Sequence, residues 1–126
     1  MASDRTPLNP QTALDLMDRW QRMEMHVRCG LSPEHPGCVR IYLLAGLKVV
    51  RRGLSPAADI HHRMLHTLLR CVADESLPWF WRSVCLENVN LPLAKLTSLL
   101  GGAESLMAAD LNARVEAARE ALPVTP

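Results

Sequence analysis

Residues 56–72 read Pro-Ala-Ala-Asp-Ile-His-His-Arg-Met-Leu-His-Thr-Leu-Leu-Arg-Cys-Val, and they hold the clearest amphipathic helix of the chain. Their apolar side chains recur three or four residues apart and form one wide face, while polar side chains occupy the opposite face. This spacing is typical of a helix that packs one side against a core. The apolar face comprises Ile60, Met64, Leu65, Leu68, Leu69 and Val72, and the polar face comprises Asp59, His62, Arg63, His66 and Arg70.

A repeated tetrapeptide precedes this helix. Gly-Leu-Ser-Pro occurs at residues 30–33 and again at residues 53–56. In each copy the glycine is expected to end one helix at a positive φ and the leucine to pack back on that helix. The serine is expected to cap the next helix, and the proline to fit its first turn. The repeat therefore predicts two helix-to-helix corners, and two copies are too few for a solenoid.

Proline and glycine also place the other helices. Asn9 and Pro10 predict the N-cap and first residue of a helix that Gly30 ends. Residues 38–52 are apolar nearly all round their middle, and we expect them to form a central buried helix. Further helices are expected at residues 77–89, at residues 91–100 with Asn90 as their cap, and at residues 103–122, where Pro123 ends the last one.

These elements predict an all-α fold of five or six short helices in a compact bundle or orthogonal array. A chain of 126 residues is long enough for one domain, which we expect at residues 10–122,. A flexible N-terminal tail is expected at residues 1–9 and a C-terminal tail at residues 123–126.

The composition of the chain excludes several classes of protein. With 14 Lys+Arg against 13 Asp+Glu and 48% hydrophobic residues, the chain is neither disordered nor strongly basic,. Its longest apolar run, residues 41–47, is too short to cross a membrane. The N-terminus has no secretory signal, so we expect a cytoplasmic protein whose cysteines are reduced. The chain has no nucleophile elbow, phosphate-binding loop or dinucleotide motif, and we expect a non-enzymatic protein without a cofactor.

Two histidine–cysteine pairs raise an alternative. His26 and Cys29 are followed by His35 and Cys38 at the same internal spacing, and these are residue types that tetrahedral zinc prefers,. The usual pair of cysteines around a tight turn is absent, and buried thiols with histidines that cap helix ends or face water are the simpler explanation of the pattern. A small zinc-binding helical protein is thus a secondary hypothesis.

Residues 40–72 give a second alternative, because they superficially resemble the helix-turn-helix of bacterial repressors. Residues 19–82 also hold ten basic and five acidic residues. The match is degenerate, since Asp59 stands where the pattern needs Val or Ile. A DNA-binding transcriptional regulator is the alternative function, with Arg51, Arg52 and Arg63 as its candidate contacts.

The segment Trp79-Phe80-Trp81-Arg82 concentrates three of the five aromatic residues of the chain. Successive helical residues point about 100° apart, so at least one of the three rings must lie near the surface. In a purely structural interpretation, Phe80 and Trp81 pack inside and Trp79 covers a neighbouring loop. In the functional one, the segment anchors a partner, because Trp and Arg dominate interface hot spots.

The sequence therefore favours a protein–protein interaction module, acting as an adaptor, regulator or inhibitor. A homodimer is expected, since the chain has more apolar helix faces than one small core needs. The candidate partner-binding residues are Trp79, Trp81, Arg82, His62, His66 and Arg70.

Overall fold

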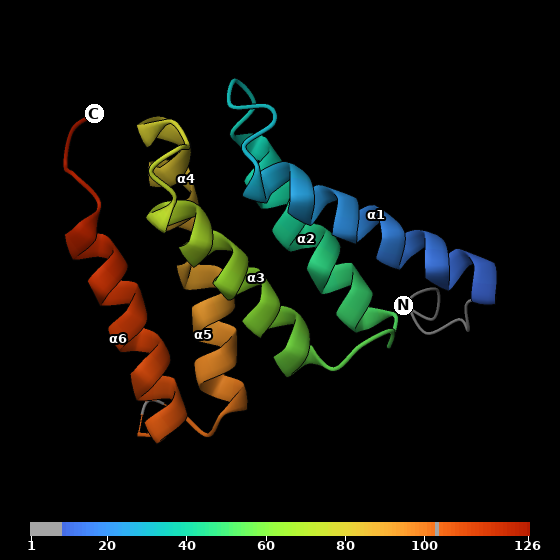
Figure 1. Ribbon diagram of the computed structural model, residues 1–126. Coiled ribbons are helices and arrows are strands. Elements are labelled where there is room, and N and C mark those ends of the chain that lie inside the picture. Colours follow the sequence, from blue (N-terminus) through green and yellow to red (C-terminus); the bar gives the residue numbers. More distant parts are fainter. Residues whose placement is uncertain (1–8, 103) are drawn as a thin grey trace.

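Helices make up the whole regular structure of the described chain. The computed structural model describes residues 9–102 and 104–126, so most of the expected N-terminal tail lies outside the described residues. Within these ranges there are six helices and no strand, which confirms the all-α prediction (Figure 1). None of these helices has the length and apolar character needed to cross a membrane. The helices are α1 Pro10–Arg28, α2 Gly37–Arg51, α3 Ala57–Ala73, α4 Trp79–Asn88, α5 Asn90–Leu99 and α6 Leu106–Ala121.

Helix α3 lies at the centre. It packs against each of the other five helices, with α1 and α2 on one side of it and α6 on the other (Figure 1). The expectation that residues 38–52 form the central buried helix is wrong. Ile41 and Leu44 of α2 are each more than half exposed, because α1 and α3 cover one side of α2 and nothing in the described chain covers these two side chains.

Both predicted corners end their first helix as expected. Gly30 and Gly53 have φ values of 57° and 71°, and the next residue donates its amide to the carbonyl five residues earlier. This is the Schellman arrangement, in which a glycine adopts the left-handed conformation at no steric cost. The leucine prediction holds for Leu54, which packs on the core, and is wrong for Leu31, which is exposed.

The predicted serine caps of these corners are absent. Helix α2 begins only after Pro36, and α3 begins after Pro56, and neither N-cap residue makes a side-chain hydrogen bond. Ser32 instead pairs its hydroxyl with Nε2 of His26 at 2.7 Å. Ser32 lies four residues before the N-cap of α2 and Ser55 lies one residue before the N-cap of α3, so neither serine is at the capping position.

Of the other predicted N-caps, some form and some do not. Asn9 caps α1 as expected, accepting a hydrogen bond from the amide of Thr12 at 2.8 Å. Asn90 does not cap α5, because α5 follows α4 after Val89 alone and the Asn90 side chain accepts from Arg119 of α6 instead. Helix α6 begins at Leu106, after the cap residue Ser105, rather than at residue 103.

A glycine sets how closely α2 approaches α3. Gly46 is buried in the middle of α2, where a Cβ atom would lie 2.4 Å from Sδ of Met64 and 3.1 Å from Nε1 of Trp20. Trp20 in turn stacks on Tyr42, with ring centroids 5.8 Å apart. A side chain at residue 46 must therefore shift the buried thioether of Met64 and press on the ring of Trp20.

We predict that Gly46→Ala lowers the free energy of unfolding by about 1–3 kcal/mol, because overpacking exceeds the gain in helix propensity. Gly37→Ala is the matched control in the same helix, since a Cβ there meets nothing within 4 Å. The control should change stability by less than about 0.5 kcal/mol. Urea unfolding followed by circular dichroism measures both, and equal midpoints for the two variants would contradict the close packing at Gly46.

Candidate functional site

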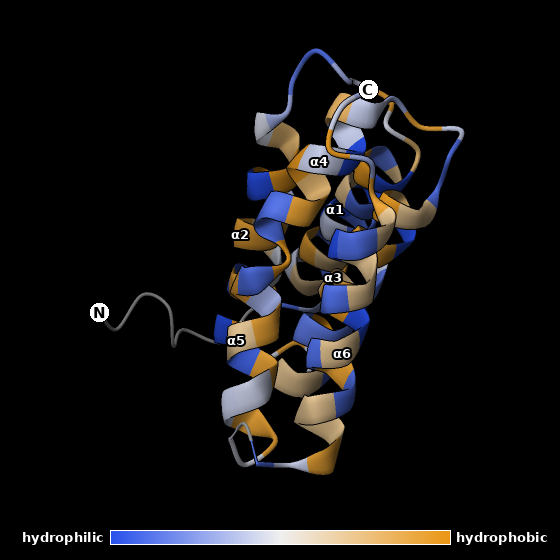
Figure 2. Ribbon diagram, turned by 90° about the vertical axis from the view of Figure 1, so that its left-hand side faces the viewer, coloured by the Kyte–Doolittle hydropathy of each residue, from blue (hydrophilic) through white to orange (hydrophobic). Residues whose placement is uncertain are grey.

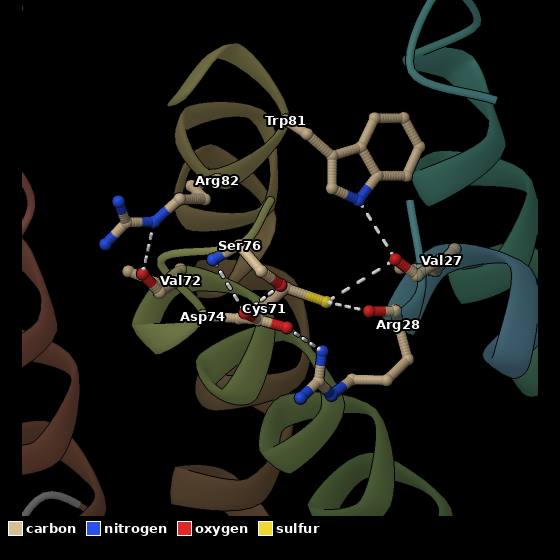
Figure 3. A network of polar contacts seen from close by, with 8 residues as sticks. All are labelled: Val27, Arg28, Cys71, Val72, Asp74, Ser76, Trp81 and Arg82. Atoms are coloured by element: carbon tan, nitrogen blue, oxygen red, sulfur yellow. Dashed lines mark hydrogen bonds and ion pairs between the residues drawn. The ribbon is translucent and has the colours of Figure 1, made fainter. Parts of the chain in front are cut away.

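The aromatic segment is mostly committed to the fold. Trp81 is fully buried and donates its indole N–H to the carbonyl of Val27 at 2.9 Å, as Figure 3 shows. Trp79 is half-buried and donates to the carbonyl of Pro123 at 2.7 Å. Phe80 is exposed instead. The prediction of Trp81 as a surface anchor is therefore wrong, and Trp79 covers the C-terminal segment as in the structural interpretation.

Arg82 also has a structural partner. Its Nε donates to the carbonyl of Val72 at 2.9 Å, which joins the start of α4 to the end of α3 (Figure 3). Beside it, Arg28 and Asp74 form an ion pair at 2.7 Å that joins α1 to α3. Hydrogen bonds from Ser76 and Arg28 lower the pKa of Asp74 to about 2. This network joins α1, α3 and α4 where they meet, although Nε of Arg28 is buried without a hydrogen-bond partner in the described chain.

The buried thiols of this region are not accessible to a substrate. Cys71 and Cys85 are both fully buried, and Cys71 lies 3.5 Å from the carbonyl of Val27. The hydrogen bond between the two thiols lowers the pKa of Cys71, and together with burial it raises the pKa of Cys85. A reactive thiol must be exposed as well as ionised, so this pair suits a core rather than a reactive site.

Three of the predicted partner-binding residues lie together on the polar face of α3. His62 and His66 are exposed and stack with ring centroids 6.5 Å apart, and Arg70 is exposed further along the helix. Arg63 lies on the same face, but its guanidinium group already has partners within the chain. It holds both carboxylate oxygens of Glu24 at 2.7 to 3.0 Å and lies over the Trp20 ring.

This pairing weighs against the DNA-binding alternative. Arg63 is paired with Glu24. Of the three candidate contacts, only Arg51 is exposed and makes no hydrogen bond or ion pair with the described residues. The helix that would enter a major groove is α3, which packs against all five other helices. A recognition helix needs one long free face, and here α1 and α6 flank the exposed strip.

The zinc alternative is contradicted by the placement of its ligands. Within residues 9–102 and 104–126, no group of three or more His, Cys, Asp or Glu side chains is close enough to hold a metal ion. His26 bonds Ser32, whereas His35 is exposed beside Glu34. The loop between α1 and α2 separates the two pairs. Equal spacing within each pair therefore does not bring the four side chains together.

The structure contains two surface features that the sequence did not single out. The first is a hollow between α3 and α6. Its volume is about 480 Å³. Leu106 and Met107, in the first turn of α6, are 89% and 65% exposed beside it. The packed part of α6 begins one residue later, at Ala108. Figure 2 shows apolar residues at this lower end of α6, next to the end of α5. We name this the α3–α6 surface, with His62, Leu106, Met107, Asp110, Leu111 and Arg114 as its residues.

The second surface feature is a pocket between α2 and α5, with α3 as its floor. Its volume is about 470 Å³, and its walls are mainly apolar, with four leucines among the eleven lining residues. His61 lies in the floor and is only 2% exposed, and neither of its ring nitrogens has a hydrogen-bond partner. Burial and the positive charge of Lys95 lower the pKa of His61. We name this the α2–α5 pocket, with Arg40, Leu44, His61, Met64, Leu91 and Lys95 as its principal residues.

A sequence signal for this pocket exists. His61 lies three and four residues before Met64 and Leu65, and it therefore shares the apolar side of α3 rather than the polar side of His62 and His66,. A histidine among core positions is unusual unless it has a partner. The pocket itself depends on how three helices meet, which periodicity does not reveal.

Comparison with known proteins supplies no family. No family model matches the chain, and neither the curated proteins nor the solved structures give a match.

We predict that His61 makes the fold sensitive to acid. Because its pKa is lower in the folded chain than the usual value of about 6.5, the unfolded chain binds the proton more readily, and stability falls as the pH drops below about 7,. His61→Phe removes both unpaired nitrogens and should raise the free energy of unfolding by about 1 kcal/mol at neutral pH.

Urea unfolding between pH 5 and 8 measures this effect. The variant should lose the part of the pH dependence that lies near neutrality, whereas His35→Phe, a change at an exposed histidine, should keep it. Identical pH profiles for the wild type and His61→Phe would contradict the placement of His61.

Proposed function

We propose that the chain is a non-enzymatic protein-binding module, an adaptor, regulator or inhibitor, that binds through the α3–α6 surface. One observation carries this proposal, namely the exposure of Leu106 and Met107 side by side at the rim of a hollow. Leaving two large apolar side chains in water forfeits about 1.5–3 kcal/mol each relative to burial. Clustered exposure of this kind marks protein-interaction sites.

The composition of the surface supports a protein partner. Methionine and arginine are enriched at interfaces, and Met107 and Arg114 lie about two turns apart on the same helix,. His62 of α3 forms part of the opposite wall, so one of the predicted partner-binding residues belongs to this surface. Apolar residues with a polar rim give the arrangement typical of a binding patch.

The charges of the surface support a homodimer. Asp59 and Asp110 line the hollow together with Arg114, so both signs are present around an apolar centre. A two-fold interface places the same patch on both copies and needs this self-complementarity. Arg114 and Asp110 pair within α6 at 3.1 Å and are both largely exposed, which leaves them free to exchange partners between copies.

We place this activity in the cytoplasm. All four cysteines, Cys29, Cys38, Cys71 and Cys85, are free thiols, which suits a reducing compartment,.

Light scattering and sedimentation test the proposal. We expect a dimer of the 14.0 kDa chain at micromolar concentration. Met107→Glu should weaken self-association by about tenfold or more, because desolvating a carboxylate at a central apolar contact costs more than about 1.4 kcal/mol. Leu14→Asp is the matched control, since Leu14 is 65% exposed on α1, away from the surface.

A wild-type monomer at high concentration would remove the dimer. The interaction surface is then tested by capture from the native host, with the captured protein identified and purified. Binding of that protein should be lost with Met107→Glu and kept with Leu14→Asp. Equal binding by both variants would exclude the α3–α6 surface.

A further inference from the structure

We infer that the α2–α5 pocket binds a small amphipathic carboxylate, a molecule with an aliphatic chain and one anionic end. This inference goes beyond the proposed protein-binding function and does not depend on it, because the pocket and the α3–α6 surface share no lining residue.

The size and walls of the pocket fit such a ligand. Small-molecule sites range over about 300–1,000 Å³ and are mostly apolar with a few polar groups that fix orientation. The α2–α5 pocket has about 470 Å³, and Leu43, Leu44, Leu47, Met64, Leu91 and Pro92 form most of its surface. An aliphatic chain is the complement of walls that are leucine-rich and lack aromatic rings.

The charged groups select the end group. Arg40 from α2 and Lys95 from α5 line the pocket, and both side chains belong to exposed residues, so they stand at its mouth rather than in its floor. Every charged residue that lines the pocket is basic. A positive rim attracts an anion and repels an ammonium group, and arginine and lysine are the usual partners of carboxylates.

His61 is the second, independent observation. A buried histidine with two unpaired nitrogens destabilises the fold, and an apolar residue at this position would avoid that cost,. The other buried residues of α3 are apolar apart from Thr67, and no group in the described chain pairs with this imidazole. An occupant whose carboxylate enters between Lys95 and the floor supplies the missing acceptor after a small turn of the ring.

The charges around the pocket also oppose self-association through this site. Two copies that met through this pocket would bring Arg40 and Lys95 of one copy against the same residues of the other. Like charges at such a contact oppose it. A ligand with a negative end has no such penalty.

The test is a titration with octanoate, decanoate and dodecanoate, each kept below its micelle concentration, followed by methyl NMR and calorimetry. Decanol and decylammonium are the controls, with the same chain but no negative charge. We expect saturable binding of one carboxylate per chain, with shifts confined to methyl groups of Leu44, Leu47, Met64 and Leu91. Decanol should bind at least about tenfold more weakly and decylammonium more weakly still, as expected for loss of a charged hydrogen bond.

Variants locate the anionic end. Lys95→Gln and Arg40→Gln should each weaken decanoate binding about five- to tenfold, while Arg51→Gln, an exposed arginine of α2 outside the pocket, should leave it unchanged,. His61→Phe should weaken decanoate and leave decanol unaffected.

Three results would overturn the inference. One is decanol or decylammonium binding as tightly as decanoate, which would remove the anion selectivity. Another is the absence of shifts at the pocket methyl groups. The third is a shift of these same methyl groups with protein concentration alone, which would make a second copy the occupant. None of these results bears on the α3–α6 surface, whose residues the variants leave intact.

Discussion

Helix α3 touches every other helix, and eight of its seventeen residues are buried. Its three- and four-residue spacing of apolar side chains turns a wide face toward α1, α2, α4 and α5, while α6 covers a further edge. Removing one fully buried leucine from such a position, Leu65 or Leu68, typically costs 2–5 kcal/mol, a large share of the stability of a small domain. The close approach at Gly46 and the ion pairs of Arg28 and Arg63 all join another helix to α3.

A helix that is surrounded on most sides also organises the surface. Successive residues of α3 point about 100° apart, so His61 faces the α2–α5 pocket while its neighbour His62 faces the α3–α6 surface,. One helix therefore contributes a side chain to each candidate site. The two differ in kind, because the pocket is leucine-lined with a positive rim and the other surface carries charges of both signs. An unpaired buried imidazole is a stability cost that proteins accept at functional positions.

The sequence predicted local structure better than packing. The amphipathic face of α3, the cap at Asn9 and the glycine endings at Gly30 and Gly53 follow from rules within one or two turns. Periodicity does not say which element covers an apolar face, so α2 was expected in the centre although Ile41 and Leu44 are exposed. Composition drew attention to Trp79 and Trp81, whose indole N–H groups bond carbonyls of distant segments. Both candidate sites arise where separate helices meet, which no single segment records.

Hydrogen exchange of the native chain tests the central position of α3 most directly. Amides that open only with global unfolding exchange at a rate set by the full free energy of unfolding, whereas edge elements exchange through smaller openings. The amides of Leu65 to Cys71 should therefore match the stability from urea unfolding, and those of α6 should exchange faster. Exchange of α3 at or above the rate of α6 would contradict a fold built around α3.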